Sequence, residues 1–210
     1  MTLITWYSIL SVNNPIDVAI SPEHKIYVLA LNGVFLYDSL LFAFPIKLTP
    51  TKFATDGKSF WVLDSPHEQI YRFEKNGNFI GSIKIPGNDI SISDGNLLIA
   101  GRKNFLVSPD EKLRIELSPE DGNLCSIANE NVFLGFNGKI IKYNQIGEKK
   151  EEFIYKGYDG FAPIQNYLII IKDNKVILPD TTVTINNFIS ADGDGNIAAI
   201  LEGKSILVIK

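Results

Sequence analysis

The sequence predicts an all-β fold, a six-bladed β-propeller of four-stranded antiparallel blades that forms a single domain over residues 1–210. Three observations predict this fold. Short apolar segments recur at a nearly constant spacing along the chain. Phe and Tyr are plentiful, with 13 and 8 copies, and aromatic residues favour strands. No stretch keeps a helical apolar period for three turns.

Two series of apolar residues share the same period. In the first series, successive members lie 30 to 37 residues apart: Tyr27, Trp61, Leu98, Phe133, Leu168 and Ala198. In the second series, successive members lie 30 to 36 residues apart: Leu36, Tyr71, Leu106, Ile141, Ile177 and Leu207. Two independent series with one period indicate a structural repeat of the length typical of a propeller blade.

Each repeat begins with a short strand, a tight turn and two more strands, and ends with a more polar outer strand. The predicted innermost strands are Asp17–Ile20, Lys52–Thr55, Asp89–Ile92, Leu124–Ile127, Phe161–Ile164 and Phe188–Ser190. The predicted turns that follow them are 22–24, 56–57, 94–95, 129–130, 165–166 and 192–195. Their Asp-Gly and Asn-rich sequences are typical of hairpins, because such turns need residues that tolerate positive φ.

The last repeat ends after its third strand, so it lacks an outer strand of its own. At the other end of the chain, Thr2–Ser8 alternates between polar and apolar residues and has high β propensity. We therefore expect this N-terminal strand to complete the last blade. Such closure would remove an open sheet edge and join the first blade to the last.

The second repeat carries the most specific motif. In it, a strand ends in an Asp, a short turn follows, and the next strand leads to a Gly turn, at Asp64, Gln69, Ile70, Phe73 and Gly77. This pattern resembles the NHL repeat, and the turns at 94–96 and 195–197 look like inter-strand turns of the same superfamily. The resemblance, to NHL-repeat and gluconolactonase-like propellers, implies a six-bladed architecture. It implies no single activity, because such propellers include protein-binding, RNA-binding, lactonase and lyase members.

The same resemblance suggests where a site lies. Gluconolactonase-like relatives hold a divalent ion with acidic and amide groups at the mouth of the central channel. Around that mouth we place five predicted binding residues, at or near the starts of innermost strands: Asp17, Lys52, Asp89, Asn123 and Asn187. Carboxylate and amide oxygens suit calcium, whereas a lysine can neutralise the ring instead. Both a divalent-cation site and a polar channel without a cofactor stay open, and no catalytic residue or metal ligand is assigned.

Composition and motifs exclude several function classes. The net charge of −4 and the pI of about 5.2 argue against a nucleic-acid partner. The apolar window at 28–46 contains Asn32-Gly33 and Pro45, which read as turns and argue against a membrane span. The one cysteine, Cys125, allows no intramolecular disulfide and leaves the cellular compartment open. The segment 192–196 resembles half of a calcium loop, but its position predicts a hairpin turn.

Two hypotheses about function follow. The first is a non-enzymatic binding or scaffold propeller that presents its channel-mouth loops to a protein or peptide partner. The alternative is a metal-dependent hydrolase of the lactonase type, with an ion at the central channel. A further expectation is self-association through the uncharged outer strand of the first repeat, at Leu40, Phe42 and Phe44, although cover by the 45–50 loop would explain that strand equally well.

Overall fold

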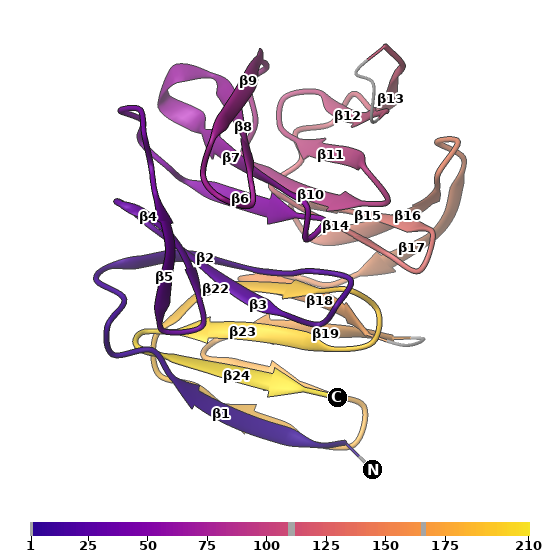
Figure 1. The fold of residues 1–210 in the computed structure, drawn as a ribbon. Coiled ribbons are helices and arrows are strands. Elements are labelled where there is room, and N and C mark those ends of the chain that lie inside the picture. The colour runs from indigo at the N-terminus through magenta and orange to yellow at the C-terminus, as the bar shows by residue number, and fades with distance from the viewer. Residues whose placement is uncertain (1, 109–111, 165–166) are drawn as a thin grey trace.

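The computed structural model describes residues 2–108, 112–164 and 167–210, which form six four-stranded antiparallel sheets arranged as the blades of a β-propeller (Figure 1). The prediction of an all-β, six-bladed fold is confirmed. A 3-10 turn at Ser65–His67 is the one helical element among the described residues, and none of their helices is long and apolar enough to cross a membrane. The predicted turn at 165–166 lies outside the described residues.

The first three blades each follow the predicted order from the innermost to the outermost strand. Blade 1 consists of β2 (Pro15–Ile20), β3 (Ile26–Ala30), β4 (Gly33–Leu36) and β5 (Ser39–Ala43). Blade 2 consists of β6 (Lys52–Thr55), β7 (Ser59–Asp64), β8 (Gln69–Glu74) and β9 (Phe79–Lys84). Blade 3 consists of β10 (Asp89–Ser93), β11 (Asn96–Ala100), β12 (Asn104–Val107) and β13 (Arg114–Ser118).

The last three blades repeat this order, except that blade 6 takes its outer strand from the other end of the chain. Blade 4 consists of β14 (Leu124–Ala128), β15 (Asn131–Phe136), β16 (Lys139–Asn144) and β17 (Lys149–Ile154). Blade 5 consists of β18 (Gly160–Ile164), β19 (Tyr167–Lys172), β20 (Lys175–Ile177) and β21 (Thr182–Thr184). Blade 6 consists of β22 (Phe188–Gly193), β23 (Ala198–Glu202), β24 (Ser205–Ile209) and β1 (Ile4–Ser8).

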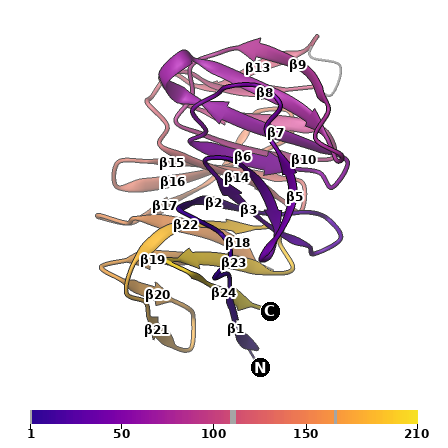
Figure 2. The same ribbon diagram turned by 60° about the vertical axis from the view of Figure 1, so that its left-hand side comes forward.

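The N-terminal strand closes the ring as predicted. Strand β1 pairs antiparallel with β24, from Ile4 opposite Ile209 to Ser8 opposite Ser205. Beyond that pairing, the backbone N–H of Lys210 donates to the carbonyl of Leu3 at 2.9 Å. The two ends of the chain therefore lie side by side, as Figures 1 and 2 both show. Blade 6 thus combines the first and the last segments of the chain.

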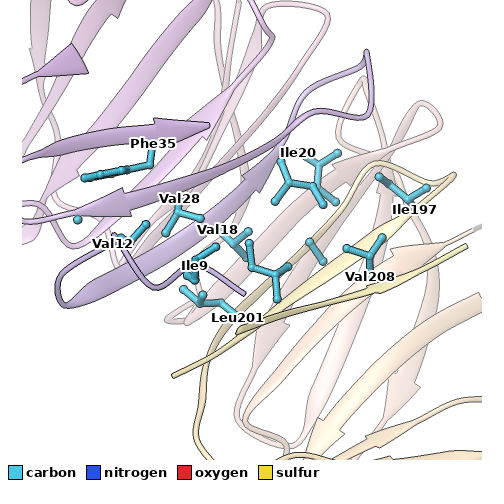
Figure 3. Packing of buried hydrophobic residues seen from close by; sticks show 13 residues of the cluster. Ile9, Val12, Val18, Ile20, Val28, Phe35, Ile197, Leu201 and Val208 are labelled. Carbon is cyan, nitrogen blue, oxygen red and sulfur yellow. The ribbon is translucent and has the colours of Figure 1, made fainter. Parts of the chain in front are cut away.

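The core is divided among the contacts between neighbouring blades, which we call seams. Within the described residues, six clusters of buried apolar side chains occur, one at each seam. Figure 3 shows the seam between blades 6 and 1, where Val18 and Val28 pack toward Leu201 and Val208. The cluster between blades 4 and 5 is the smallest of these, with four buried members: Phe133, Ile140, Phe161 and Ile170.

Blade 2 covers one residue of the uncharged outer strand of blade 1, Phe42, while Ser39, Leu40 and Ala43 of that strand are exposed. Phe42 is 6% exposed, and its ring lies 5.4 Å from that of Phe60 and 5.9 Å from that of Phe73. Phe42 is thus a core residue, which corrects its predicted place on a surface for self-association. Phe44 is half-buried against Phe73, and Leu40 stays exposed. Self-association through these two residues stays a prediction.

Candidate binding site in the central channel

The innermost strands surround a central channel with a volume of about 220 Å³. We call its two ends the entry mouth, where the innermost strands begin, and the turn mouth, where the turns that follow these strands lie. The cavity at the entry mouth has a volume of only about 30 Å³. Lys52 and Asp89 line both cavities and so mark the narrow point between them. The channel is therefore open mainly toward the turn mouth.

Two of the predicted residues form an ion pair at this narrow point. The Nζ of Lys52 lies 3.2 Å from Oδ1 of Asp17, and the other carboxylate oxygen of Asp17 accepts from the backbone N–H of Phe53 at 2.9 Å. Burial opposes the charge on Lys52, but the carboxylates of Asp17 and Asp89 outweigh it and raise the pKa of this lysine. Lys52 is consequently held as a partly buried cation.

The third predicted residue, Asp89, contacts the next blade. Its Oδ2 accepts from the backbone N–H of Cys125 at 2.8 Å. Burial raises the pKa of Asp89 to about 6, although the charge on Lys52 works in the opposite direction. Burial, and then the neighbouring Asp89, raise the pKa of the Cys125 thiol well above its ordinary value. A thiol held in its protonated form is a poor nucleophile, so Cys125 serves as a packing residue.

The same link between innermost strands recurs where the ring closes. On blade 6, the hydroxyl of Ser190 accepts from the N–H of Val18 at 3.0 Å, and Oδ2 of Asp192 accepts from the N–H of Ile20 at 2.8 Å. Burial raises the pKa of Asp192 to about 7. Asp192 was expected in a turn, but β22 extends through Gly193 and places it in the strand. The alternation of Ser190 and Asp192 is the signal that could have identified it.

The two predicted amides do not join the channel. Asn123 is exposed and lies beside Leu124 and Tyr158, in a separate hollow between blades 4 and 5. Asn187 is also exposed, and its backbone carbonyl accepts from the N–H of Gly203 at 3.1 Å. Both residues precede their strands by one position, which leaves them on the surface. The structure therefore brings together Asp17, Lys52 and Asp89 only.

These side chains do not fit the divalent cation that the gluconolactonase-like resemblance implies. Both carboxylate oxygens of Asp17 already accept from N–H donors, and the ammonium of Lys52 supplies the local positive charge. Among the described residues, no three His, Cys, Asp or Glu side chains lie in a group that suits a metal ion. A cation at this place would have to displace Lys52, so we derive no chemistry through a bound metal.

Acidic side chains dominate the channel and its turn mouth. The charged residues that line it are six acids and one lysine: Asp17, Asp89, Asp94, Glu130, Asp192, Asp194 and Lys52. At the rim, Nδ1 of His24 lies 2.6 Å from Oδ2 of Asp194. The other oxygen of Asp194 accepts from the N–H groups of Asn196 and Ile197 at 2.8 and 2.9 Å, as in a hairpin turn. Apart from Asp17 and Asp89, these acids were missed because each lies in a segment that the sequence predicts as a turn.

Comparisons with known proteins agree on the fold alone. No protein-family model and no curated protein sequence matches the chain. Virginiamycin B lyase from Staphylococcus aureus is similar in structure, with a TM-score of 0.65, 14% identity, and coverage of 96% of this chain and 82% of the lyase. BamB from Moraxella catarrhalis has a TM-score of 0.55, 13% identity and coverage of 92% and 71%. BBS1N, solved in complex with ARL6DN, has a TM-score of 0.62, 14% identity and coverage of 93% and 76%. The resemblance to β-propellers is thereby confirmed at the level of the fold.

Proposed function

We propose that this protein is a non-enzymatic binding propeller whose turn mouth receives a basic side chain from a protein or peptide partner. The observation that carries this proposal is the charge of the channel, where six acidic residues face one lysine. Low-dielectric walls lined by one sign of charge concentrate the field and favour an opposite charge inside. An Arg or Lys side chain would supply that charge.

The size of the channel supports the same partner. Pockets for small molecules usually measure about 300–1,000 Å³, whereas this channel measures about 220 Å³. The smaller volume suits one long side chain inserted from the turn mouth. A guanidinium or ammonium group at its tip would donate charge-assisted hydrogen bonds to the carboxylates of Asp94, Glu130 and Asp194.

The arrangement of the deep carboxylates favours binding over catalysis. Asp17, Asp89 and Asp192 each accept a hydrogen bond from a backbone N–H of the next blade, so they hold the innermost strands together. Among the structural neighbours, BBS1N was solved in complex with ARL6DN, while the lyase shows that the same fold also serves enzymes. The fold alone decides nothing between these roles. The binding role is favoured because the carboxylates of Asp17, Asp89 and Asp192 are already occupied by hydrogen bonds between blades.

The test is a titration of the protein with a fluorescein-labelled hexa-arginine peptide, followed by fluorescence anisotropy, with hexa-glutamate as the negative control. The double variant Asp94→Asn/Glu130→Gln should weaken hexa-arginine binding about tenfold, because two facing charges are lost. The matched control, Asp121→Asn/Asp180→Asn, changes the net charge equally but alters acids that do not line the channel. Equal weakening in both double variants would show non-specific attraction and contradict the proposal.

A further inference from the structure

The seam between blades 4 and 5 contains a groove with a volume of about 530 Å³. We call it the seam groove and define it by the apolar residues Phe153, Tyr155, Leu168, Ile170, Ile177 and Leu178 together with two lysines, Lys156 and Lys172. The seam groove lies at the seam whose cluster of buried apolar side chains is the smallest among the described residues. The two blades do not fill the space between their faces, so an apolar hollow remains open at the surface.

The seam groove has a buried floor and exposed rims. Ile170 and Leu178 are 4% and 6% exposed and form the floor. Phe153 and Tyr155, at the end of blade 4, are half-buried, and Ile177 on blade 5 is 40% exposed at the rim. A concave site of about 300–1,000 Å³ with mainly apolar and aromatic walls is the usual form of a small-molecule pocket. The volume and lining of the seam groove fall within that description.

The charge of the seam groove has one sign. Among its described lining residues, the charged ones are Lys156 and Lys172, and none is acidic. The Nζ of Lys172 donates to the backbone carbonyl of Lys156 at 2.6 Å, which holds this ammonium beside the turn at Gly157. An ammonium has three N–H donors, so two remain for a ligand. The seam groove thus combines apolar walls with a fixed positive group at one place.

We propose that the seam groove binds an elongated apolar molecule that carries one carboxylate, of the fatty-acid class. The hydrocarbon chain would lie against Phe153, Leu168 and Ile170, where burial of apolar surface stabilises it. The carboxylate would accept hydrogen bonds from Lys156 and Lys172. This site is separate from the acidic channel, whose charge has the opposite sign, so it does not depend on the function proposed above.

The experiment compares two probes of equal chain length, octanoate and 1-octanol, by isothermal titration calorimetry. Octanoate should bind about tenfold more tightly than 1-octanol, because only its carboxylate is attracted by the two lysines. The double variant Lys156→Gln/Lys172→Gln should weaken octanoate binding about tenfold and leave 1-octanol binding unchanged. The matched control, Lys58→Gln/Lys84→Gln, removes two lysines from blade 2 and should leave both affinities unchanged.

Two further variants test whether a loss of binding arises in the seam groove itself. One changes the rim of the groove, and the other changes the acidic channel. Ile177→Asp adds a carboxylate at the exposed rim and should weaken octanoate binding more than 1-octanol binding. The channel variant Asp94→Asn/Glu130→Gln should bind octanoate as the unmodified protein does. The absence of saturable octanoate binding, equal affinity for the two probes, or the same loss in the control as in Lys156→Gln/Lys172→Gln would each overturn the proposal. Circular dichroism establishes that each variant is folded.

Discussion

Two seams of the same ring are built in opposite ways. Between blades 1 and 2, the Phe42 ring packs against Phe60 and Phe73, and a Cβ added at Gly77 would come within 2.7 Å of Phe42. Between blades 4 and 5, the buried cluster is the smallest among the described residues and a groove of about 530 Å³ stays open. One seam is filled by aromatic rings, whereas the other leaves room for a ligand.

The difference shows that the composition of an outer strand does not reveal what covers it. The sequence of β5 contains no charge and left two explanations open, an exposed contact surface and local cover by the 45–50 loop, whereas Phe42 is buried by the neighbouring blade. The sequence of β17 begins with four charged residues, which are exposed, but its half-buried Phe153 borders the seam groove. Cover depends on how much volume the facing blade supplies, and that volume comes from another part of the chain.

The largest effect should come from truncating one aromatic residue at each seam. Phe42→Ala should lower the free energy of unfolding by about 3–5 kcal/mol, because it leaves a cavity in a packed seam. Phe153→Ala should cost only about 1 kcal/mol, because the side chain is half-buried beside an open groove. Urea denaturation measures both values. Similar losses in the two variants would mean that the seams are equally well packed.

Substitution of two glycines, Gly77 and Gly157, distinguishes the cost of backbone strain from the cost of side-chain crowding. Gly77 and Gly157 both have positive φ, of 88° and 64°. Of the two, only Gly77 lies so close to a side chain, that of Phe42, that an added Cβ would overlap with it. Gly77→Ala should therefore cost about 2–4 kcal/mol, the sum of backbone strain and overpacking. Gly157→Ala should cost about 1 kcal/mol, from the backbone alone, since an added Cβ would meet only Nζ of Lys172, at 3.9 Å. Thermal unfolding of the two variants, monitored by circular dichroism, tests whether the difference exists.

A smaller effect concerns the seam between blades 6 and 1, which relies on a carboxylate as well as on apolar packing. Burial raises the pKa of Asp192 to about 7, so ionisation of this group costs stability as the pH rises toward 7. Asp89, with a pKa of about 6, acts in the same direction at lower pH. We expect the free energy of unfolding to fall by roughly 1 kcal/mol between pH 6 and pH 8 through Asp192.

The variant Asp192→Asn isolates that contribution. Its amide oxygen can still accept from the N–H of Ile20, but the side chain cannot ionise. At pH 8 the variant should be more stable than the unmodified protein by about 2 kcal/mol, less than the full pKa shift implies because the side chain is only partly buried. Asp94→Asn, which removes an exposed carboxylate from the same mouth, is the control. An undiminished fall in stability between pH 6 and pH 8 in Asp192→Asn would rule out this account, since Asp89 alone should leave only a smaller fall.

The sequence by itself determined the repeat, the number of blades and the closing role of the N-terminal strand. Each of these features depends on patterns along the chain: period-two alternation within a strand, turn residues with positive φ, and a missing strand at one end matched by an extra strand at the other. The predicted innermost strand Lys52–Thr55 has the observed bounds. Such patterns belong to the order of residues along the chain, so they can be recognised without knowledge of the tertiary contacts.

Only the tertiary structure decided which polar residues meet in the channel and which seam stays open. Asp192 and Ile20 are joined by a hydrogen bond although 172 residues separate them, and Asn187, one position before its strand, lies outside the channel. The seam groove likewise depends on side chains of two blades at once. No local pattern encodes these outcomes, because the volume and the hydrogen-bond partners at each place are supplied by segments that become neighbours only when the ring forms.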